Sequence, residues 1–121
     1  KSKDLKKYNS KKTNKYRERQ KEIYGSYYKV INTCRAMAGQ VGLHWTEVEN
    51  WYSKQFMKQQ AHCAICGEIS EILCIDHNHK TGELRGLLCS NCNSGIGFLK
   101  DSQEVCIKAS EYLSTSKERI I

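Results

Sequence analysis

A short polar segment in the second half of the chain carries the side chains best suited to chemistry. One carboxylate and two imidazoles, Asp76, His77 and His79, lie within four positions of one another. An imidazole titrates near neutrality and can take a proton from water, so His77 is a candidate general base. Because Mg²⁺ prefers oxygen ligands, Asp76 and Asn93 could bind a catalytic Mg²⁺ (or Mn²⁺). The pattern alone also fits a second metal site or a turn.

Two Cys-x-x-Cys pairs flank this segment. The pairs are Cys63 with Cys66 and Cys89 with Cys92, with 22 residues between them. Thiolates bind Zn²⁺ tetrahedrally, and four protein ligands leave no position for water. We therefore expect one structural Zn²⁺ per chain, with a redox dithiol as the alternative.

The zinc site is expected to hold the elements that carry the polar residues. Asn93 follows Cys92 directly, and the first cysteine pair precedes the segment that leads to Asp76. In a regular strand Asp76 and His77 would face opposite sides. The strand must therefore end or bulge at this point if both side chains act on one group.

The second half of the chain predicts a hairpin and two helices. Apolar runs at 69–76 and 84–88 surround a polar turn, as in a β-hairpin. Cys89 opens a short helix that ends near Gly95 or Gly97. Asp101 and Glu104 fit the start of a last helix.

Two further helices are expected before the first cysteine pair. Apolar residues recur at helical spacing over 23–35, and Gly39 and Gly42 then break the chain. Thr46 and Glu49 fit a capping box for a helix that reaches about residue 60. Its apolar stripe could stack on bases, but core packing is the favoured interpretation for Val48, Trp51, Tyr52 and Phe56. The remaining cysteines lie in apolar patterns and are expected to be buried thiols: Cys34, Cys74 and Cys106.

Charge is concentrated at the N-terminus. The chain has 121 residues, of which 20 are Lys or Arg and 13 Asp or Glu, and its net charge is +7. Residues 1–35 hold 12 of the bases and 3 of the acids, which favours a polyanionic partner such as nucleic acid. A solvated tail without a partner is the alternative. The candidate DNA-binding bases of this arm are Lys6, Lys7, Lys11, Lys12, Lys15, Arg17 and Arg19.

These observations predict one domain behind a basic arm. The arm spans 1–22 and the domain 23–121, with helices over 23–60, a zinc-held core over 61–100 and a C-terminal helix over 101–117. No apolar run approaches the roughly 20 residues that cross a bilayer, so no membrane partner is expected. The odd number of cysteines, 7 in all, and the lack of a signal-peptide pattern predict a reducing, cytoplasmic setting.

The motifs taken in order resemble the recombination endonuclease VII family of HNH nucleases, which indicates a prokaryotic or phage-type setting. The resemblance rests on the first Cys-x-x-Cys, the run from Asp76 to Gly82, and the run from Arg85 to Asn93, and it covers about residues 60–100. It implies an α+β fold with a ββα-metal core, flanking helices and a metal-dependent DNA endonuclease activity that hydrolyses phosphodiester bonds.

The resemblance also implies roles for single residues. Asp76 and Asn93 would bind Mg²⁺, His77 would be the general base, and His79 would contact the scissile phosphate. Two further bases, Lys80 and Arg85, would assist at the DNA.

Several functions stay open at this point. The nuclease could nick double-stranded DNA, cleave branched DNA or junctions, or act as a sequence-specific homing or restriction enzyme, and paired cuts would favour a homodimer. A zinc-containing nucleic-acid-binding module without catalysis is the alternative of a different class, and it would need neither Asp76 nor Asn93.

Overall fold

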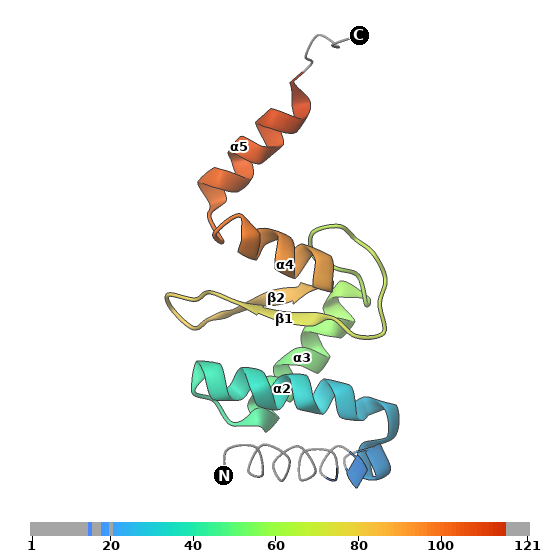
Figure 1. Ribbon diagram of the computed structural model, residues 1–121. Helices are drawn as coiled ribbons and strands as arrows, with labels where there is room; N and C mark the ends of the chain where they lie inside the picture. The colour runs from blue at the N-terminus through green and yellow to red at the C-terminus, as the bar shows by residue number, and fades with distance from the viewer. Residues whose placement is uncertain (1–14, 16–17, 20, 116–121) are drawn as a thin grey trace, which may run out of the picture.

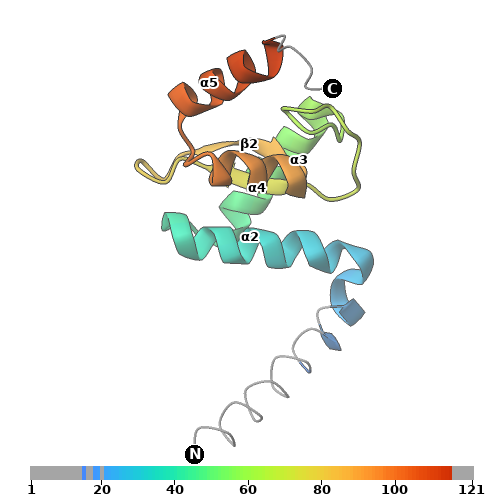
Figure 2. The same cartoon turned by 45° about the horizontal axis from the view of Figure 1, so that its top comes forward.

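The computed structural model describes Lys15, residues 18–19 and residues 21–115. Its elements are the 3₁₀ turn η1 (Gly25–Tyr27), the helices α2 (Tyr28–Val41) and α3 (Trp45–Gln59), the strands β1 (Cys74–His77) and β2 (Leu84–Leu88), and the helices α4 (Ser90–Phe98) and α5 (Gln103–Ser114). Figure 1 shows α2 and α4 on opposite sides of the antiparallel hairpin β1–β2, with α5 beyond α4, and Figure 2 shows the same elements in a turned view in which α4 overlaps the hairpin. The predicted α+β class is confirmed, whereas most of the proposed arm lies outside the described residues.

Helices α2 and α3 form the larger part of the core. The side chains of Cys34 on α2 and Val48 on α3 are completely buried. Gly42 ends α2 with a φ of 74°, a left-handed conformation that favours glycine, whereas the predicted break at Gly39 is wrong because Gly39 lies within the helix. The predicted capping box at Thr46 and Glu49 is wrong, because α3 begins two residues earlier. His44 is the N-cap, and its backbone N–H donates to the Glu47 carboxylate over 3.1 Å.

The aromatic stripe of α3 packs in the core, as predicted. Tyr52 is buried and stacks on Phe56, with 5.8 Å between the ring centroids. The Tyr52 hydroxyl accepts a hydrogen bond of 3.1 Å from the backbone N–H of Leu73, which lies just before β1. Tyr52 therefore joins α3 to the start of the hairpin.

The cysteines outside the two pairs differ in burial. Cys34 is a buried thiol, as predicted, and burial raises its pKa to about 12. Cys74 and Cys106 are only half-buried, so the prediction of buried thiols is wrong for both. Cys74 begins the short strand β1, and Cys106 lies on α5, which packs little against the core.

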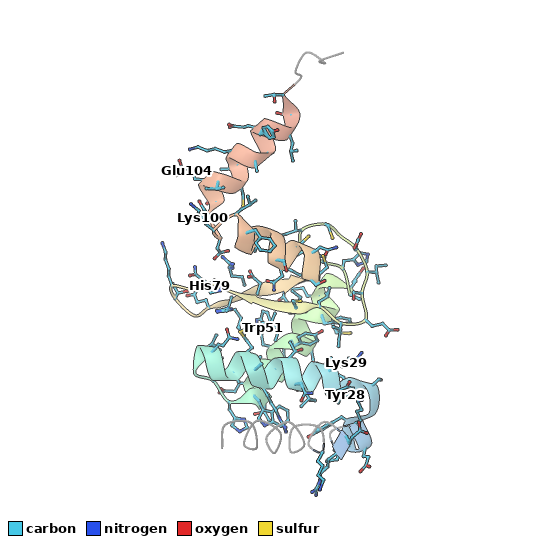
Figure 3. All side chains as sticks on the ribbon, viewed as in Figure 1. Tyr28, Lys29, Trp51, His79, Lys100 and Glu104 are labelled. Atoms are coloured by element: carbon cyan, nitrogen blue, oxygen red, sulfur yellow. The ribbon has the colours of Figure 1, made fainter. Side chains whose placement is uncertain are left out.

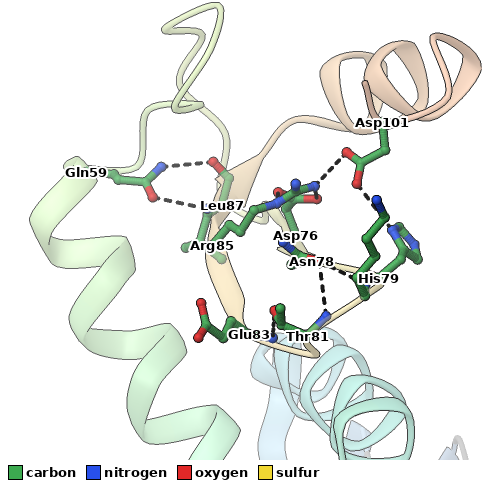
Figure 4. Close-up of polar contacts among 10 residues, drawn as sticks. Gln59, Asp76, Asn78, His79, Thr81, Glu83, Arg85, Leu87 and Asp101 are labelled. Carbon is green, nitrogen blue, oxygen red and sulfur yellow. Dashed lines mark hydrogen bonds and ion pairs between the residues drawn. The ribbon is translucent and has the colours of Figure 1, made fainter. Parts of the chain in front are cut away.

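Gln59 joins the end of α3 to the second strand. Its Oε1 accepts from the backbone N–H of Leu87 over 3.1 Å, and its Nε2 donates to the Leu87 carbonyl over 2.9 Å. One side-chain amide thus pairs with both backbone groups of a strand residue, as a neighbouring strand would (Figure 4). This pairing fixes β2 against α3.

Helix α5 is shorter than predicted and begins at a different cap. The Ser102 hydroxyl accepts from the Val105 N–H, so Ser102 rather than Asp101 is the N-cap. Tyr112 and Leu113, near the end of α5, are 72% and 82% exposed. Within the described part of the chain, no helix has the length and apolar character needed to cross a membrane.

Candidate active site and metal centre

The four paired cysteines form one cluster. Their sulfur atoms all lie within 4.8 Å of one another, and the Sγ atoms of Cys66 and Cys89 are 3.7 Å apart. Four sulfurs at about 2.3 Å from a tetrahedral Zn²⁺ are separated by about 3.8 Å. The cluster therefore fits the predicted structural zinc.

Two different segments supply these ligands. Cys63 and Cys66 lie in the loop after α3, where Gly67 has a φ of 77° and its N–H donates to the Cys63 carbonyl. Cys89 follows β2 and is the N-cap of α4, since its sulfur accepts from the Cys92 N–H. The cluster thus joins the loop, the hairpin and α4.

The pKa values of two thiols in the cluster, Cys63 and Cys92, are shifted in opposite directions. Burial alone would raise the pKa of the Cys63 thiol, but backbone hydrogen bonds from Cys89, Cys66 and Ile65 lower it to about 6. A hydrogen bond with the Cys89 side chain, together with burial, raises the pKa of Cys92 to about 12. Zinc ligands must be thiolates, so metal binding at neutral pH has to release the proton of Cys92.

The hairpin contains a bulge at the candidate catalytic residues. Asp76 pairs with Gly86 and His77 pairs with Leu84, which leaves Arg85 as an extra residue on β2. The sequence required the strand to end or bulge here if Asp76 and His77 act on one group. The ladder is irregular between these two residues, and β1 ends at His77. A bulge changes the direction of side chains relative to regular alternation.

Asp76 is a buried carboxylate, and Arg85 neutralises it. The Nε and Nη2 atoms of Arg85 donate to the two carboxylate oxygens over 2.6 and 2.9 Å (Figure 4). The Asp76 side chain is 10% exposed and that of Arg85 is 36% exposed. Hydrogen bonds with Asp76 first, and then with Asp101, raise the pKa of Arg85 above its ordinary value.

The two histidines lie side by side where β1 passes into the turn. Their ring centroids are 4.4 Å apart, with His77 half-buried and His79 exposed. The turn is ordered by Asn78, whose Oδ1 accepts from the backbone N–H groups of Lys80 and Thr81. His79 is thus held beside the hairpin, facing the segment between α4 and α5 (Figure 3).

Asp101 belongs to this cluster, although its place in the sequence predicted only a helix cap. Its Oδ1 accepts from Arg85 Nη2 over 2.7 Å, and its Oδ2 lies 3.5 Å from His79 Nδ1. The hydrogen bond from Arg85 is the main cause of the lowered pKa of Asp101. The chain between Arg85 and Asp101 contains no motif that predicts this contact.

A pocket of about 720 Å³ opens beside the cluster. Arg85 and Asp101 are part of its wall, and the cations Lys80 and Lys100 line it together with His79. Several positive side chains around a surface pocket suit a phosphate group. The residues predicted to contact DNA include Lys80 and Arg85 but not Lys100, which also lines this pocket.

The remaining predicted residues are less closely joined to this cluster. Asn93 lies half-buried in α4, and its backbone N–H donates to the Cys89 carbonyl over 3.0 Å. Among the residues that the structure describes, no hydrogen bond joins Asn93 to Asp76. In the basic arm, Lys15 and Arg19 are exposed, whereas the other predicted bases lie outside the described residues: Lys6, Lys7, Lys11, Lys12 and Arg17.

Comparison with known proteins extends the similarity beyond the motifs. The model of the recombination endonuclease VII family matches residues 6–115, a longer stretch than the 60–100 expected from the motifs. The chain is 40% identical over 72 residues to the Gene 59 protein of Mycobacterium phage D29. The match covers 56% of this chain and 42% of that protein. It is 41% identical over 69 residues to the Gene 59 protein of Mycobacterium phage L5, a match that covers 54% of this chain and 41% of that protein. The matches thus span about two fifths of each relative. No solved structure matches.

Proposed function

Because the chain belongs to the recombination endonuclease VII family, we propose that it is a Mg²⁺-dependent HNH DNA endonuclease that hydrolyses phosphodiester bonds. The observation that carries the proposal is the buried carboxylate of Asp76 beside His77, at the bulge of a hairpin that ends in a four-cysteine cluster. A buried, ion-paired carboxylate next to a half-buried imidazole is an arrangement suited to acid–base and metal chemistry.

Each residue of the cluster has a role in this proposal. His77 takes the proton from the attacking water, and His79 contacts the scissile phosphate. Asp76 and Asn93 offer a carboxylate and an amide oxygen, donors that fit Mg²⁺ (or Mn²⁺). A bound Mg²⁺ would stabilise the charge that develops on the phosphate and the leaving 3′-oxygen. The products would carry 5′-phosphates.

The zinc site is structural in this proposal. It holds the loop before the hairpin, the end of β2 and the start of α4 together, so that the candidate catalytic residues keep one geometry. A reducing, cytoplasmic setting belongs to the proposal, because it keeps the four thiols unoxidised.

The proposed substrate is double-stranded or branched DNA. The cations around the pocket, Lys80, Arg85 and Lys100, would contact phosphates near the cut. The basic arm would add contacts along the backbone and make binding strongly dependent on salt. Nicking, junction cleavage and sequence-specific cutting of the homing or restriction type are alternatives within this proposal.

A homodimer is proposed for paired cuts. The exposed apolar side chains near the end of α5, Tyr112 and Leu113, support it because they have little other cover in the described residues. Size-exclusion chromatography with light scattering would measure the molar mass, and a mass of one chain at assay concentration would contradict the dimer.

The activity itself is tested with zinc-loaded protein on two substrates. Supercoiled plasmid and a synthetic four-way junction are incubated with Mg²⁺ or with EDTA, and the strands are resolved on a gel. Cleavage that requires Mg²⁺ is the expected result, and the preferred substrate identifies the subclass. Mobility shifts without any cut strand would instead favour the non-catalytic zinc-containing binding module.

A further inference from the structure

The guanidinium of Arg85 lies between two carboxylates. Its Nη2 atom donates to Asp76 over 2.9 Å and to Asp101 over 2.7 Å, while its Nε donates to Asp76 over 2.6 Å (Figure 4). Both oxygens of Asp76 are therefore occupied by one cation. Asp101, in contrast, gives Arg85 only Oδ1.

The backbone holds Asp101 in this position. Lys100 and Asp101 have φ values of 63° and 52°, a left-handed conformation that is uncommon outside glycine. The conformation is kept by hydrogen bonds from the Lys100 N–H to the Gly97 carbonyl, over 3.0 Å, and from the Asp101 N–H to the Ile96 carbonyl, over 2.8 Å. The backbone of Asp101 is thus fixed to the end of α4, independently of Arg85. Strained backbone that the surroundings over-determine is common at functional sites.

The charges of this group create a conflict with the proposed metal site. A divalent cation on Asp76 would lie beside the positive charge of Arg85, and both would compete for the same two oxygens. Arg85 is 36% exposed at its side chain, so it has room to move. Asp101 already binds it and is the nearest carboxylate that can neutralise it after it leaves Asp76.

We propose that Asp101 is a positioning residue: it holds the guanidinium of Arg85 when this group leaves Asp76 and Asp76 binds a divalent cation. This inference rests on the proposed function. After the transfer, Arg85 stays at the wall of the cationic pocket, where it can face a DNA phosphate. His79 remains beside the same carboxylate, since its Nδ1 lies 3.5 Å from the second oxygen.

The test is a mutant cycle read out by Mn²⁺ binding to the zinc-loaded protein, measured by electron paramagnetic resonance without DNA. The variants are Asp101→Asn, Arg85→Gln and the double variant. Asp101→Asn is expected to weaken Mn²⁺ binding about tenfold, in the range found for residues that support metal ligands. In the Arg85→Gln background the same substitution should change binding less than twofold, because the competing cation is gone.

Two controls separate this role from general effects. Glu104→Gln removes an exposed carboxylate three residues away, outside the cluster, and should leave binding within twofold. Asp101→Glu should restore part of the missing affinity, and thermal unfolding shows that each variant is folded. An equal weakening by Asp101→Asn in both backgrounds would overturn the inference, because it would show that Asp101 acts only by its charge.

The outcome also distinguishes the two proposals. Wild-type protein that neither binds Mn²⁺ nor cuts DNA would contradict the proposed function, and the inference would fail with it. Wild-type protein that binds Mn²⁺ and cuts DNA, with an Asp101→Asn variant of unchanged affinity, would contradict the inference alone.

Discussion

Arg85 is the extra residue of the hairpin bulge, and its guanidinium donates two hydrogen bonds, of 2.6 and 2.9 Å, to the carboxylate of Asp76. Asp76 pairs with Gly86, so in a regular ladder Arg85 would face the opposite side of the sheet. The bulge removes this restriction. The inserted residue thus allows the buried carboxylate of Asp76 on β1 to contact the guanidinium of Arg85 on β2.

The zinc cluster predicts a large effect of removing one ligand. Cys89→Ser should lose the metal and the cooperative unfolding transition, because Cys89 is both a ligand and the N-cap of α4. Structural zinc contributes about 10 kcal/mol or more in small zinc domains, as much as the whole stability of many domains. Circular dichroism melts and zinc analysis would measure this. The matched control is Cys106→Ser, and a Cys89→Ser variant as stable as this control would contradict the prediction.

The contact between Tyr52 and Leu73 predicts a smaller loss of stability. Tyr52→Phe keeps the ring but leaves the buried N–H of Leu73 without its acceptor. An unsatisfied buried donor costs about 1–3 kcal/mol, so the free energy of unfolding in urea should fall by this amount. The exposed Tyr112 gives a control of the same chemistry, and Tyr112→Phe should unfold like the wild type. Equal stabilities of the two variants would refute this account of Tyr52.

The basic arm predicts a change in salt dependence. Replacing Lys6, Lys7 and Lys11 by Gln should weaken DNA binding and lower the slope of log K against log salt by about 0.9 for each phosphate that the arm no longer neutralises. Fluorescence anisotropy over a range of NaCl concentrations measures this slope. A triple variant of exposed lysines elsewhere, Lys54, Lys58 and Lys108, serves as the control. If both triple variants give the same slope, the arm is a solvated tail.

Short-range patterns predicted the elements well. Two apolar runs around a polar turn located β2, and the paired cysteines located the metal cluster. The starts of helices were predicted less accurately. His44 and Ser102 are the N-caps of α3 and α5, whereas the predicted caps, Thr46 and Asp101, lie within two positions of them. Local sequence alone does not decide between such neighbours.

The contact between Arg85 and Asp101 was beyond prediction, because no motif links the two residues. Asp101 meets Arg85 only because α4 turns the chain back over the hairpin, and a left-handed turn at Lys100 aims the carboxylate. The bulge, in contrast, could be expected, since Asp76 and His77 can serve one site only where the ladder is irregular. The structure therefore adds most where packing brings together residues that no sequence motif links.

The central claim is that His77 is the base of a metal-dependent nuclease, and its most direct test is single-turnover nicking of supercoiled plasmid in Mg²⁺ by His77→Ala. A positioned general base contributes about 10²- to 10⁴-fold, so we predict a fall in rate of this size with DNA affinity and melting temperature unchanged. His44→Asn, which keeps a good N-cap on α3, is the control and should cut at the wild-type rate. A His77→Ala variant that nicks within a few-fold of wild type would contradict the assignment.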